Sequence, residues 1–168
     1  MTPFIVRHAS AADCVQLSHV ACRTFAMACP ASTPALEIAR HIEGNLQPDH
    51  FGELLLQPGK IVLALEVDNQ LIGYSLLTLD PEPVGIELAD GVQEFSRCYV
   101  APEFHGTGAA GFLMNESLKH LTGPVRLSVS EENSRAIRFY QRQGFRIVGE
   151  TYFQCGDERQ RDWLMLRD

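Results

Sequence analysis

A glycine-rich turn between a strand-like and a helix-like segment is the part of the sequence best suited to chemistry. It reads His105-Gly106-Thr107-Gly108-Ala109-Ala110-Gly111. Glycines permit positive φ and let a ligand approach the backbone closely. The apolar residues that follow predict a helix, so the turn lies at a helix N-terminus with unpaired N–H groups and a positive dipole end. Such a site binds phosphate without needing a basic side chain.

Two other phosphate-binding patterns can be compared with this turn. Gly106-x-Gly108-x-x-Gly111 has the spacing of the dinucleotide fingerprint, and the acidic Glu131 follows about 20 residues later. The context argues against that interpretation, because five residues separate Val100 from Gly106 and the preceding segment predicts an antiparallel hairpin. Too little chain follows to complete a doubly wound sheet. A P-loop is excluded, since no Gly-Lys-Ser/Thr follows the glycines.

The turn resembles motif A of the GNAT (Gcn5-related) N-acetyltransferases, which is Gln/Arg-x-x-Gly-x-Gly/Ala after a strand ending in Tyr-Val. Here the strand ends in Tyr99-Val100, and His105 stands where the family usually has Gln or Arg. Downstream, Glu132-Asn133-Ser134-Arg135-Ala136-Ile137-Arg138-Phe139-Tyr140 and then Gly144-Phe145 resemble motif B. A second match at the right distance makes the resemblance specific, and it covers most of the chain.

The resemblance implies a binding site for acetyl-CoA as cosubstrate. Main-chain groups of Cys98, Tyr99 and Val100 would pair with the pantetheine arm as an added strand would. Asn133 and Ala136 would contact the cosubstrate from the next helix, which Asn133 could also cap. The turn would hold the pyrophosphate through residues His105, Gly106, Thr107, Gly108, Ala109 and Ala110.

Two side chains could move protons in this reaction. The resemblance makes Tyr140 the general acid that protonates the departing thiolate, although a phenol pKa of about 10 against a thiol pKa of about 8.5 requires help from the site. Alternatively, Tyr140 packs on the sheet. Glu94 is the best candidate for the base, directly or through a water, because an ammonium must lose a proton before attacking a thioester. Glu94 could equally be a solvated or ion-paired strand carboxylate.

Periodicity, glycines and prolines predict the elements that must position these residues. Strands are expected at residues 4–7, 60–67, 71–79, 94–100, 125–130, 146–154 and 159–166. Helices are expected at residues 10–27, from an N-cap at Thr33 followed by Pro34, from Pro48 to Leu56, from the glycine turn to Leu121, and from Ser134 to Gly144. Gly73 is expected to mark a bulge or a close packing contact. The resemblance implies an α/β (α+β) GNAT fold with a strongly twisted, mostly antiparallel sheet of about seven strands and four to five helices.

Length and composition restrict the class of protein. The 168 residues predict a single domain spanning residues 1–168, and 45% hydrophobic with 21% charged residues is typical of a soluble globular chain. A net charge of −7 argues against nucleic acid and suits a small cationic substrate. Since no apolar run approaches ~20 residues and no signal peptide is evident, we expect a cytoplasmic protein without membrane contact.

The cysteines and histidines do not predict a metal or a disulfide framework. There are five cysteines, an odd number without any Cys-x-x-Cys, which is typical of reduced intracellular thiols. Cys98 beside the turn is expected to be a small buried residue and not a nucleophile. The six histidines lack metal-ligand spacing, so we predict no metal site.

The N-terminal helical region covers the acceptor substrate in the GNAT fold. Phe25, His41, His50 and Phe51 could line that pocket, or they could be ordinary core and surface residues. The acidic stretch at residues 80–94 could steer a cationic amine, but a solvated surface loop is the preferred interpretation.

The C-terminal segment narrows the resemblance. Phe153-x-x-Gly156-x-x-x-Gln160-x-Asp162-x-x-Met165 looks like that of PaiA-type spermidine/spermine N-acetyltransferases, as does Glu94-x-x-Arg97-x-Tyr99-Val100. A polyamine or similar small cationic amine is therefore the favoured acceptor, with an amino-acid or peptide amine next. Alternatively, Gln160 and Asp162 form a polar network at a strand end.

The expected reaction is direct acetyl transfer to a primary amine, with strand amides stabilising the oxyanion and no covalent enzyme intermediate. One alternative is acetylation of a protein N-terminus or lysine, which predicts an open groove. Another is a regulatory module that binds acyl-CoA without chemistry. The dinucleotide alternative predicts NAD binding. A homodimer is expected only from the family resemblance.

Overall fold

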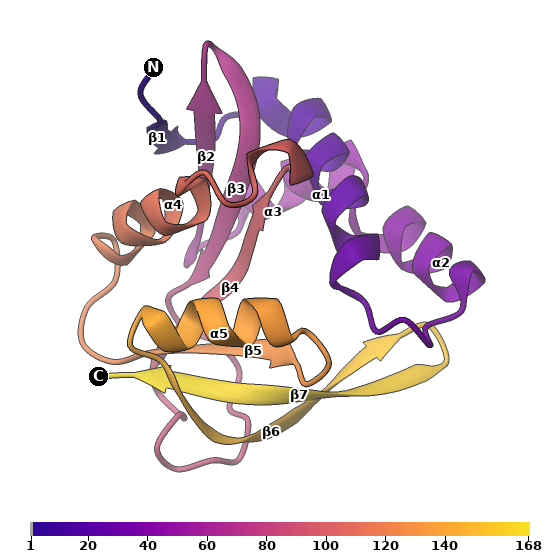
Figure 1. Ribbon diagram of the computed structural model, residues 1–168, viewed down its shortest axis with the longest axis vertical. Coiled ribbons are helices and arrows are strands. Elements are labelled where there is room, and N and C mark those ends of the chain that lie inside the picture. The colour runs from indigo at the N-terminus through magenta and orange to yellow at the C-terminus, as the bar shows by residue number, and fades with distance from the viewer. Residues whose placement is uncertain (1) are drawn as a thin grey trace.

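The computed structural model describes residues 2–168, and its centre is a seven-stranded sheet in the order β1-β2-β3-β4-β5-β7-β6 (Figure 1). All neighbouring strands are antiparallel except β4 and β5, which run parallel. This confirms the expected seven-stranded, mostly antiparallel sheet. The strands are β1 (Ile5–His8), β2 (Lys60–Val67), β3 (Gln70–Thr78), β4 (Gln93–Val100), β5 (Val125–Ser130), β6 (Arg146–Cys155) and β7 (Glu158–Arg167).

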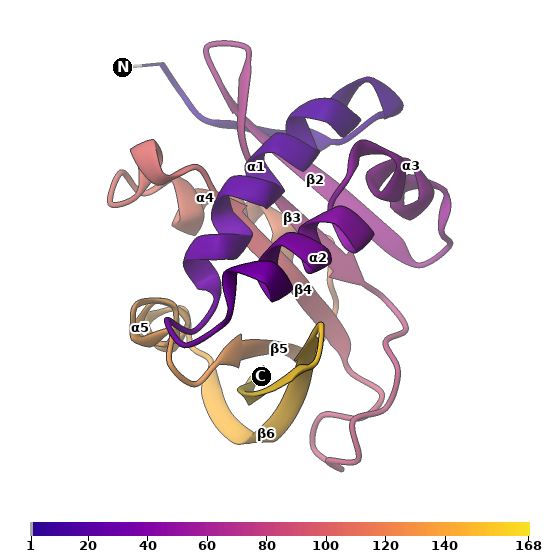
Figure 2. The same cartoon turned by 90° about the vertical axis from the view of Figure 1, so that its right-hand side faces the viewer.

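Helices cover both faces of this sheet. Figure 2 shows α1, α2 and α3 in front of β2–β4, and Figure 1 shows α4 and α5 on the other side. No helix within residues 2–168 combines the length and apolar character needed to cross a bilayer. The helices are α1 (Cys14–Ala28), α2 (Ala35–Asn45), α3 (Pro48–Leu56), α4 (Ala109–Leu118) and α5 (Ser134–Arg142), with short 3₁₀ turns at Ala11–Asp13 and Pro102–Phe104.

Several helix boundaries differ from the expectation. The first helix begins at Cys14, after a 3₁₀ turn at Ala11–Asp13, instead of at residue 10. The second helix begins at Ala35, one residue later than expected, because Thr33 does not act as its N-cap. The Thr33 hydroxyl instead accepts a hydrogen bond from Gln160 Nε2 at 2.8 Å, which ties the α1–α2 connection to β7. The helix after the glycine turn ends at Leu118 instead of Leu121.

Strands β3 and β4 approach each other closely at Gly73. A Cβ at this position would lie 2.7 Å from the backbone oxygen of Tyr99, so only glycine fits there. A register shift in the β2–β3 pairing lies beside the same residue, so Gly73 marks a packing contact next to an irregularity. The contact holds the end of β4 that leads into the glycine turn.

The pairing of β4 with β5 is the feature that opens the sheet. Only two residue pairs join these strands, Gln93↔Val125 and Glu94↔Arg126, after which they separate. The β3–β4 register also shifts between Leu76 and Leu77, which leaves Ser96 as the extra residue of a bulge. The separated strands leave one edge of β4 without a partner strand in the described chain.

The loop between β3 and β4 is held by a buried cation at this junction. Arg126 is only 2% exposed, and its guanidinium donates to the carbonyl oxygens of Glu82 and Ala89 at 2.6 and 3.1 Å. Arg126 Nε also donates to the Glu94 carboxylate at 3.0 Å. Part of the acidic stretch at residues 80–94 is therefore neutralised by this arginine.

Candidate functional site

A cavity of about 900 Å³ occupies the gap where β4 and β5 separate. It has two parts. One part lies between the exposed edge of β4, the end of β5 and the N-terminal half of α5, beside the glycine turn. The other part lies beneath α1 and α2 and reaches β6 and β7. An elongated molecule could therefore extend from the turn into a pocket on the opposite side of β4.

The glycine turn forms an anion cradle at the N-terminus of α4. Gly106 and Gly108 have φ values of 77° and 89°, and Gly108 is the N-cap residue of the helix. A Cβ at either position would meet open space, and neither N–H donates a hydrogen bond to residues 2–168. Free amides, a positive dipole end and an unobstructed approach fit a pyrophosphate group.

His105 connects the cradle to a cation. Arg135 Nη1 donates to His105 Nδ1 at 2.7 Å, and the other ring nitrogen, Nε2, lies 2.8 Å from the Val100 carbonyl oxygen. Because a guanidinium can only donate, Nδ1 must accept and Nε2 must carry the proton that the Val100 carbonyl receives. A histidine in place of the usual Gln or Arg thus holds Arg135 beside the phosphate-binding turn.

The strand residues expected to contact pantetheine lie at the edge of the gap. Cys98, Tyr99 and Val100 all line the cavity, although the Val100 carbonyl is already bonded to His105. Burial raises the pKa of the Cys98 thiol to about 12. A thiol with this pKa stays protonated at neutral pH, which agrees with the expectation that Cys98 is not a nucleophile.

Helix α5 and its N-cap bring three expected site residues to the same cavity. The Asn133 side chain accepts from Ala136 N at 3.2 Å, which confirms it as the N-cap. Asn133, Ala136 and Tyr140 then line the gap along successive turns. Burial, followed by the proximity of Cys98 and Tyr99, raises the pKa of the Tyr140 phenol well above its usual value. The phenol therefore keeps its proton at neutral pH.

Glu94 is not among the described residues that line the cavity. Its carboxylate accepts from Arg126 Nε at 3.0 Å and from Ser96 Oγ at 2.7 Å. The structure therefore shows the ion-paired alternative for Glu94, with its charge compensated by a buried arginine. Ser96 itself lines the cavity, so Glu94 lies one hydrogen bond away from the site.

Asp162 is the carboxylate that does line the cavity, and no other Asp or Glu of residues 2–168 does so. It lies on β7 between its cross-strand partners Ser130 and Thr151. Burial, reinforced by the nearby Glu131, raises the pKa of the Asp162 carboxyl to about 6. A carboxylate with this pKa is ionised at neutral pH yet basic enough to take a proton from an ammonium through solvent exchange.

Two of the four expected pocket residues lie in the part beneath α1 and α2. Phe25 and His41 stack with ring centroids 4.3 Å apart and line the cavity. Burial, assisted by Arg97, lowers the pKa of His41, so its ring is neutral at pH 7. Phe51 instead packs in the core against Tyr74, and His50 accepts from Gln47 N at the start of α3. The expectation for His50 and Phe51 is therefore corrected.

Contacts between α2 and the β6–β7 turn close the far end of this pocket. The Glu37 carboxylate accepts from Asp157 N at 3.0 Å, and the Cys155 thiol donates to the Glu37 carbonyl at 3.6 Å. Figure 1 shows the tip of the β6–β7 hairpin meeting the α1–α2 segment. These contacts close the acceptor side at one end, between α2 and the β6–β7 turn.

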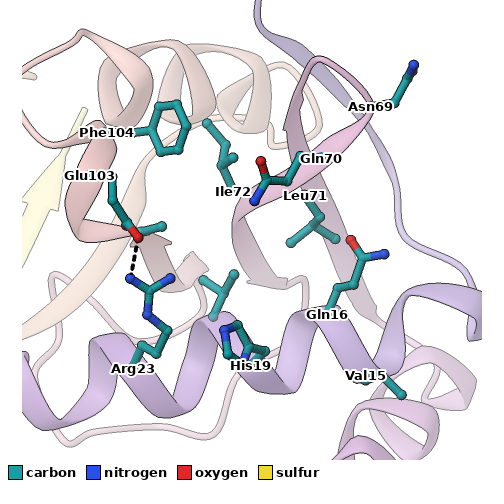
Figure 3. Close-up of a pocket in the computed structure, with 12 residues that line it drawn as sticks. Val15, Gln16, His19, Arg23, Asn69, Gln70, Leu71, Ile72, Glu103 and Phe104 are labelled. Atoms are coloured by element: carbon teal, nitrogen blue, oxygen red, sulfur yellow. Dashed lines mark hydrogen bonds and ion pairs between the residues drawn. The ribbon is translucent and has the colours of Figure 1, made fainter.

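A second cavity of about 400 Å³ lies between α1, the β2–β3 turn and the segment before the glycine turn (Figure 3). Of its lining residues, Arg23 and Glu103 carry full charges, and they pair with each other at 2.5 Å, as the dashed line shows. Because these charges compensate each other, this cavity offers no free ionic group to a ligand.

Arg97 is the pocket residue that the sequence interpretation did not use. The sequence places Arg97 in the pattern Glu94-x-x-Arg97-x-Tyr99-Val100 and Asp162 in the C-terminal pattern. Neither pattern indicates which face of its strand is buried, so neither assigns the side chain to a pocket. The bulge at Ser96 turns Arg97 and Tyr99 towards α1 and α2, opposite Leu76 and Tyr74 of β3. Strand alternation alone could not have located this bulge.

Comparisons with known proteins agree with the geometry. Residues 25–145 match the acetyltransferase (GNAT) family. An uncharacterised N-acetyltransferase of Mycobacterium tuberculosis is 36% identical over 160 residues, which cover 93% of this chain and 97% of that protein. The spermine/spermidine N(1)-acetyltransferase of Bacillus subtilis is 28% identical over 96 residues, covering 54% of this chain and 62% of that protein.

The fold has close structural neighbours. The crystal structure of the PaiA N-acetyltransferase from Thermoplasma acidophilum in complex with coenzyme A superposes with a TM-score of 0.78, covering 99% of both chains at 19% identity. At 19% sequence identity, this structural similarity shows a shared fold and nothing about the substrate. It confirms the architecture expected from the two sequence motifs.

Proposed function

The chain belongs to the acetyltransferase (GNAT) family and is an acetyl-CoA-dependent N-acetyltransferase, and we propose that its acceptor is the primary amine of a small molecule. The closure of one end of the acceptor side, where α2 and the α1–α2 connection bond to the β6–β7 hairpin, supports this proposal most strongly. A protein N-terminus or lysine would need an open groove across these elements. The hydrogen bonds of Glu37 and Thr33 lie where such a groove would run.

The cradle residues would hold acetyl-CoA, which supplies the activated acetyl group when bound. Amides of residues 106–110 would bind the pyrophosphate, with Arg135 as the nearby cation. The open edge of β4 at Cys98 and Tyr99 would pair with the pantetheine arm. Asn133 and Ala136 would contact the same arm from α5, at the opposite wall of the cavity.

Tyr140 would donate the proton to the leaving thiolate. The apolar surroundings that raise the pKa of this phenol also disfavour a thiolate placed beside it, so the two pKa values rise together. Asp162 would accept the proton of the incoming ammonium, since it is the cavity carboxylate with a pKa near 6. Glu94 would influence this proton transfer only through its hydrogen bond with the Ser96 hydroxyl.

Polyamines and similar small cationic amines are the first acceptor class to test. Three observations support the class: the net charge of −7, the carboxylate of Asp162 in the pocket, and the Bacillus subtilis relative that is named a spermine/spermidine N(1)-acetyltransferase. Amino-acid amines are the next class, because they present the same nucleophile in a molecule of similar size.

A single plate assay tests this proposal. The midpoint of thermal unfolding is measured with acetyl-CoA, CoA, NAD and no ligand, and free thiol is then followed after adding spermidine or an amino acid. Acetyl-CoA and CoA should raise the midpoint, since a ligand that binds only the native state stabilises it, and NAD should not. Thiol release that depends on a small amine supports the proposed acceptor. Turnover of a protein substrate but no small amine would refute it.

A further inference from the structure

Arg97 is a cation on the acceptor side of the cavity without an anionic partner. It lines the pocket from β4. Among residues 2–168, no carboxylate oxygen lies within 4.0 Å of its guanidinium, and its fully covered Nη1 has no hydrogen-bond partner. By contrast, the buried Arg126 pairs with Glu94. The Arg97 side chain is only partly buried, but a covered guanidinium nitrogen without a partner is unfavourable, so Arg97 is suited to a negative group that arrives with a ligand.

The phosphates of acetyl-CoA do not account for this cation. Their binding turn lies at the N-terminus of α4 and has its own cation in Arg135, held by His105. Arg97 faces the other way, because it pairs with Leu76, a core residue beneath α1 and α3. It also lies close enough to His41 of α2 to contribute to the lowered pKa of that ring. Arg97 therefore belongs to the acceptor pocket.

A carboxylate and a cation are both present in this pocket, but they are not bonded to each other. Arg97, Tyr99 and Asp162 all line this cavity. Burial raises the pKa of the Tyr99 phenol, Arg97 opposes that rise and Asp162 adds to it. No Arg97–Asp162 ion pair forms within 4.0 Å in the described residues. Separated charges of opposite sign in one cavity are complementary to a zwitterion.

We propose that Arg97 binds a carboxylate of the acceptor, so that the substrate is an amino acid whose reacting amine is directed towards Asp162. The proposal rests on the proposed acetyl transfer to a small primary amine and, within that class, favours amino acids over the polyamines. Arg97 can bind a carboxylate through two parallel N–H groups, an arrangement that a diamine cannot use. His41 is neutral and leaves Arg97 as the charged anchor, while Phe25 and Phe153 surround the pocket with apolar surface.

The test compares amino acids with the amines that lack only the carboxylate. Lysine is paired with cadaverine, ornithine with putrescine, and the remaining protein amino acids with their decarboxylated forms. We measure kcat/KM for acetylation and, independently of turnover, thermal stabilisation by each compound in the presence of CoA. The wild-type protein should prefer at least one amino acid over its amine about 10- to 100-fold, as expected for a charge-assisted bidentate contact.

Variants of Arg97 identify the residue responsible. Arg97→Met should abolish the preference by raising KM for the amino acid, whereas Arg97→Lys should restore part of it. Arg146→Met, at an exposed arginine far from the cavity lining, is the matched control and should leave the preference intact. Stabilisation by acetyl-CoA without any acceptor shows that each variant is folded and that the cradle works.

Several results would overturn the proposal. One is a wild-type protein that uses or binds the amines as well as all their amino acids, and another is an Arg97→Met variant that loses both classes equally. Binding of no amino acid in the panel would also refute it. Failure of the proposed function is distinguishable, because in that case acetyl-CoA would neither stabilise the protein nor be consumed with any amine.

Discussion

At the scale of single residues, the site depends on titratable groups that are withdrawn from water. The Tyr140 phenol and the Cys98 thiol both have a pKa raised by burial, whereas Asp162 has a pKa of about 6 for the same reason. The direction of each shift follows from desolvation, which favours the neutral form. The same effect thus keeps the acid protonated and makes the base more basic.

The role of Tyr140 can be tested by removing one oxygen atom. Tyr140→Phe should lower kcat about 100-fold, within the range for general acid catalysis, and leave the KM for acetyl-CoA nearly unchanged. The ring would still pack against Phe145, so the unfolding midpoint should change little. Tyr152→Phe removes the same atom from a half-exposed tyrosine that lines another part of the cavity and is hydrogen-bonded to Glu150, and it is the comparison. Equal turnover of both variants would remove Tyr140 from the mechanism.

The raised pKa of Asp162 predicts how kcat/KM depends on pH. Below a pH of about 6 the carboxyl is protonated in the native state, so kcat/KM should fall as pH decreases through that value. Asp162→Asn should lower kcat/KM at pH 8 about 10- to 100-fold and abolish this limb of the profile. Glu94→Gln is the comparison, and a limb that disappears in Glu94→Gln but persists in Asp162→Asn would assign the base to Glu94.

The same substitution should also change stability. Because the pKa of Asp162 is higher in the folded than in the unfolded chain, the folded state binds the proton more tightly. Its contribution to the free energy of unfolding therefore decreases as pH rises from about 4 to about 6. At pH 8, Asp162→Asn should be more stable than wild type by about 1–2 kcal/mol, after allowance for partial solvent exposure. Urea unfolding at pH 8 and pH 4 measures this difference, which should vanish at pH 4.

At the scale of elements, two local irregularities create the site. The αL conformation of Gly108 starts α4 three residues after His105, which lines the cavity, and the bulge at Ser96 turns Arg97 and Tyr99 towards the acceptor pocket. Regular elements could not do this, since an unbroken β4 would place these side chains on the opposite face.

Gly108→Ala tests the cradle. A Cβ at φ 89° should cost about 1–2 kcal/mol of stability from backbone strain alone, because it meets open space in the free protein. The methyl group would occupy the approach of the pyrophosphate, so KM for acetyl-CoA should rise about 10-fold while the acceptor KM stays constant.

Gly52→Ala is the matched control for that substitution. Gly52 lies inside α3 with a normal helical conformation and nothing within 4 Å of its Cβ position. The change should stabilise the protein by about 0.5–1 kcal/mol and leave KM for acetyl-CoA unchanged. An unaltered KM in Gly108→Ala as well would contradict the cradle assignment.

At the scale of the whole molecule, the sheet consists of two parts joined at one short junction. The two parallel residue pairs between β4 and β5 are reinforced by the ion pair of Arg126 with Glu94. On one side of the junction lie β1–β4 with α1–α4, and on the other lie β5–β7 with α5 (Figure 1). The cavity exists because the parts diverge beyond this point.

Arg126→Met should therefore weaken the whole fold. It would leave the Glu94 carboxylate and two carbonyl groups without their donor, and breaking a buried pair in this way should cost about 3–5 kcal/mol. Arg146→Met, which removes an exposed pair with Asp168, should cost less than about 0.5 kcal/mol. Urea unfolding measures both, and equal losses would show that the junction is not stabilised by Arg126.

The amino-acid sequence by itself determined the features that depend on neighbouring residues. The seven strands, the α5 cap at Asn133 and the glycine turn were predicted because periodicity, capping groups and glycine conformation act over only a few residues. The start of α2 differs from the prediction because a residue distant in the sequence contacts the predicted N-cap. Thr33 bonds Gln160 instead of capping α2, and the two are 127 residues apart.

Only the tertiary structure decided which polar groups meet. Glu94 was expected near the reacting amine, but its partner Arg126 is 32 residues away and compensates its charge. Asp162 and Arg97 reach one pocket because β4 bulges and β7 follows β5 beyond the junction. Such contacts depend on sheet order, register and bulges, which are set by the packing of all elements together, and local sequence patterns do not encode them individually.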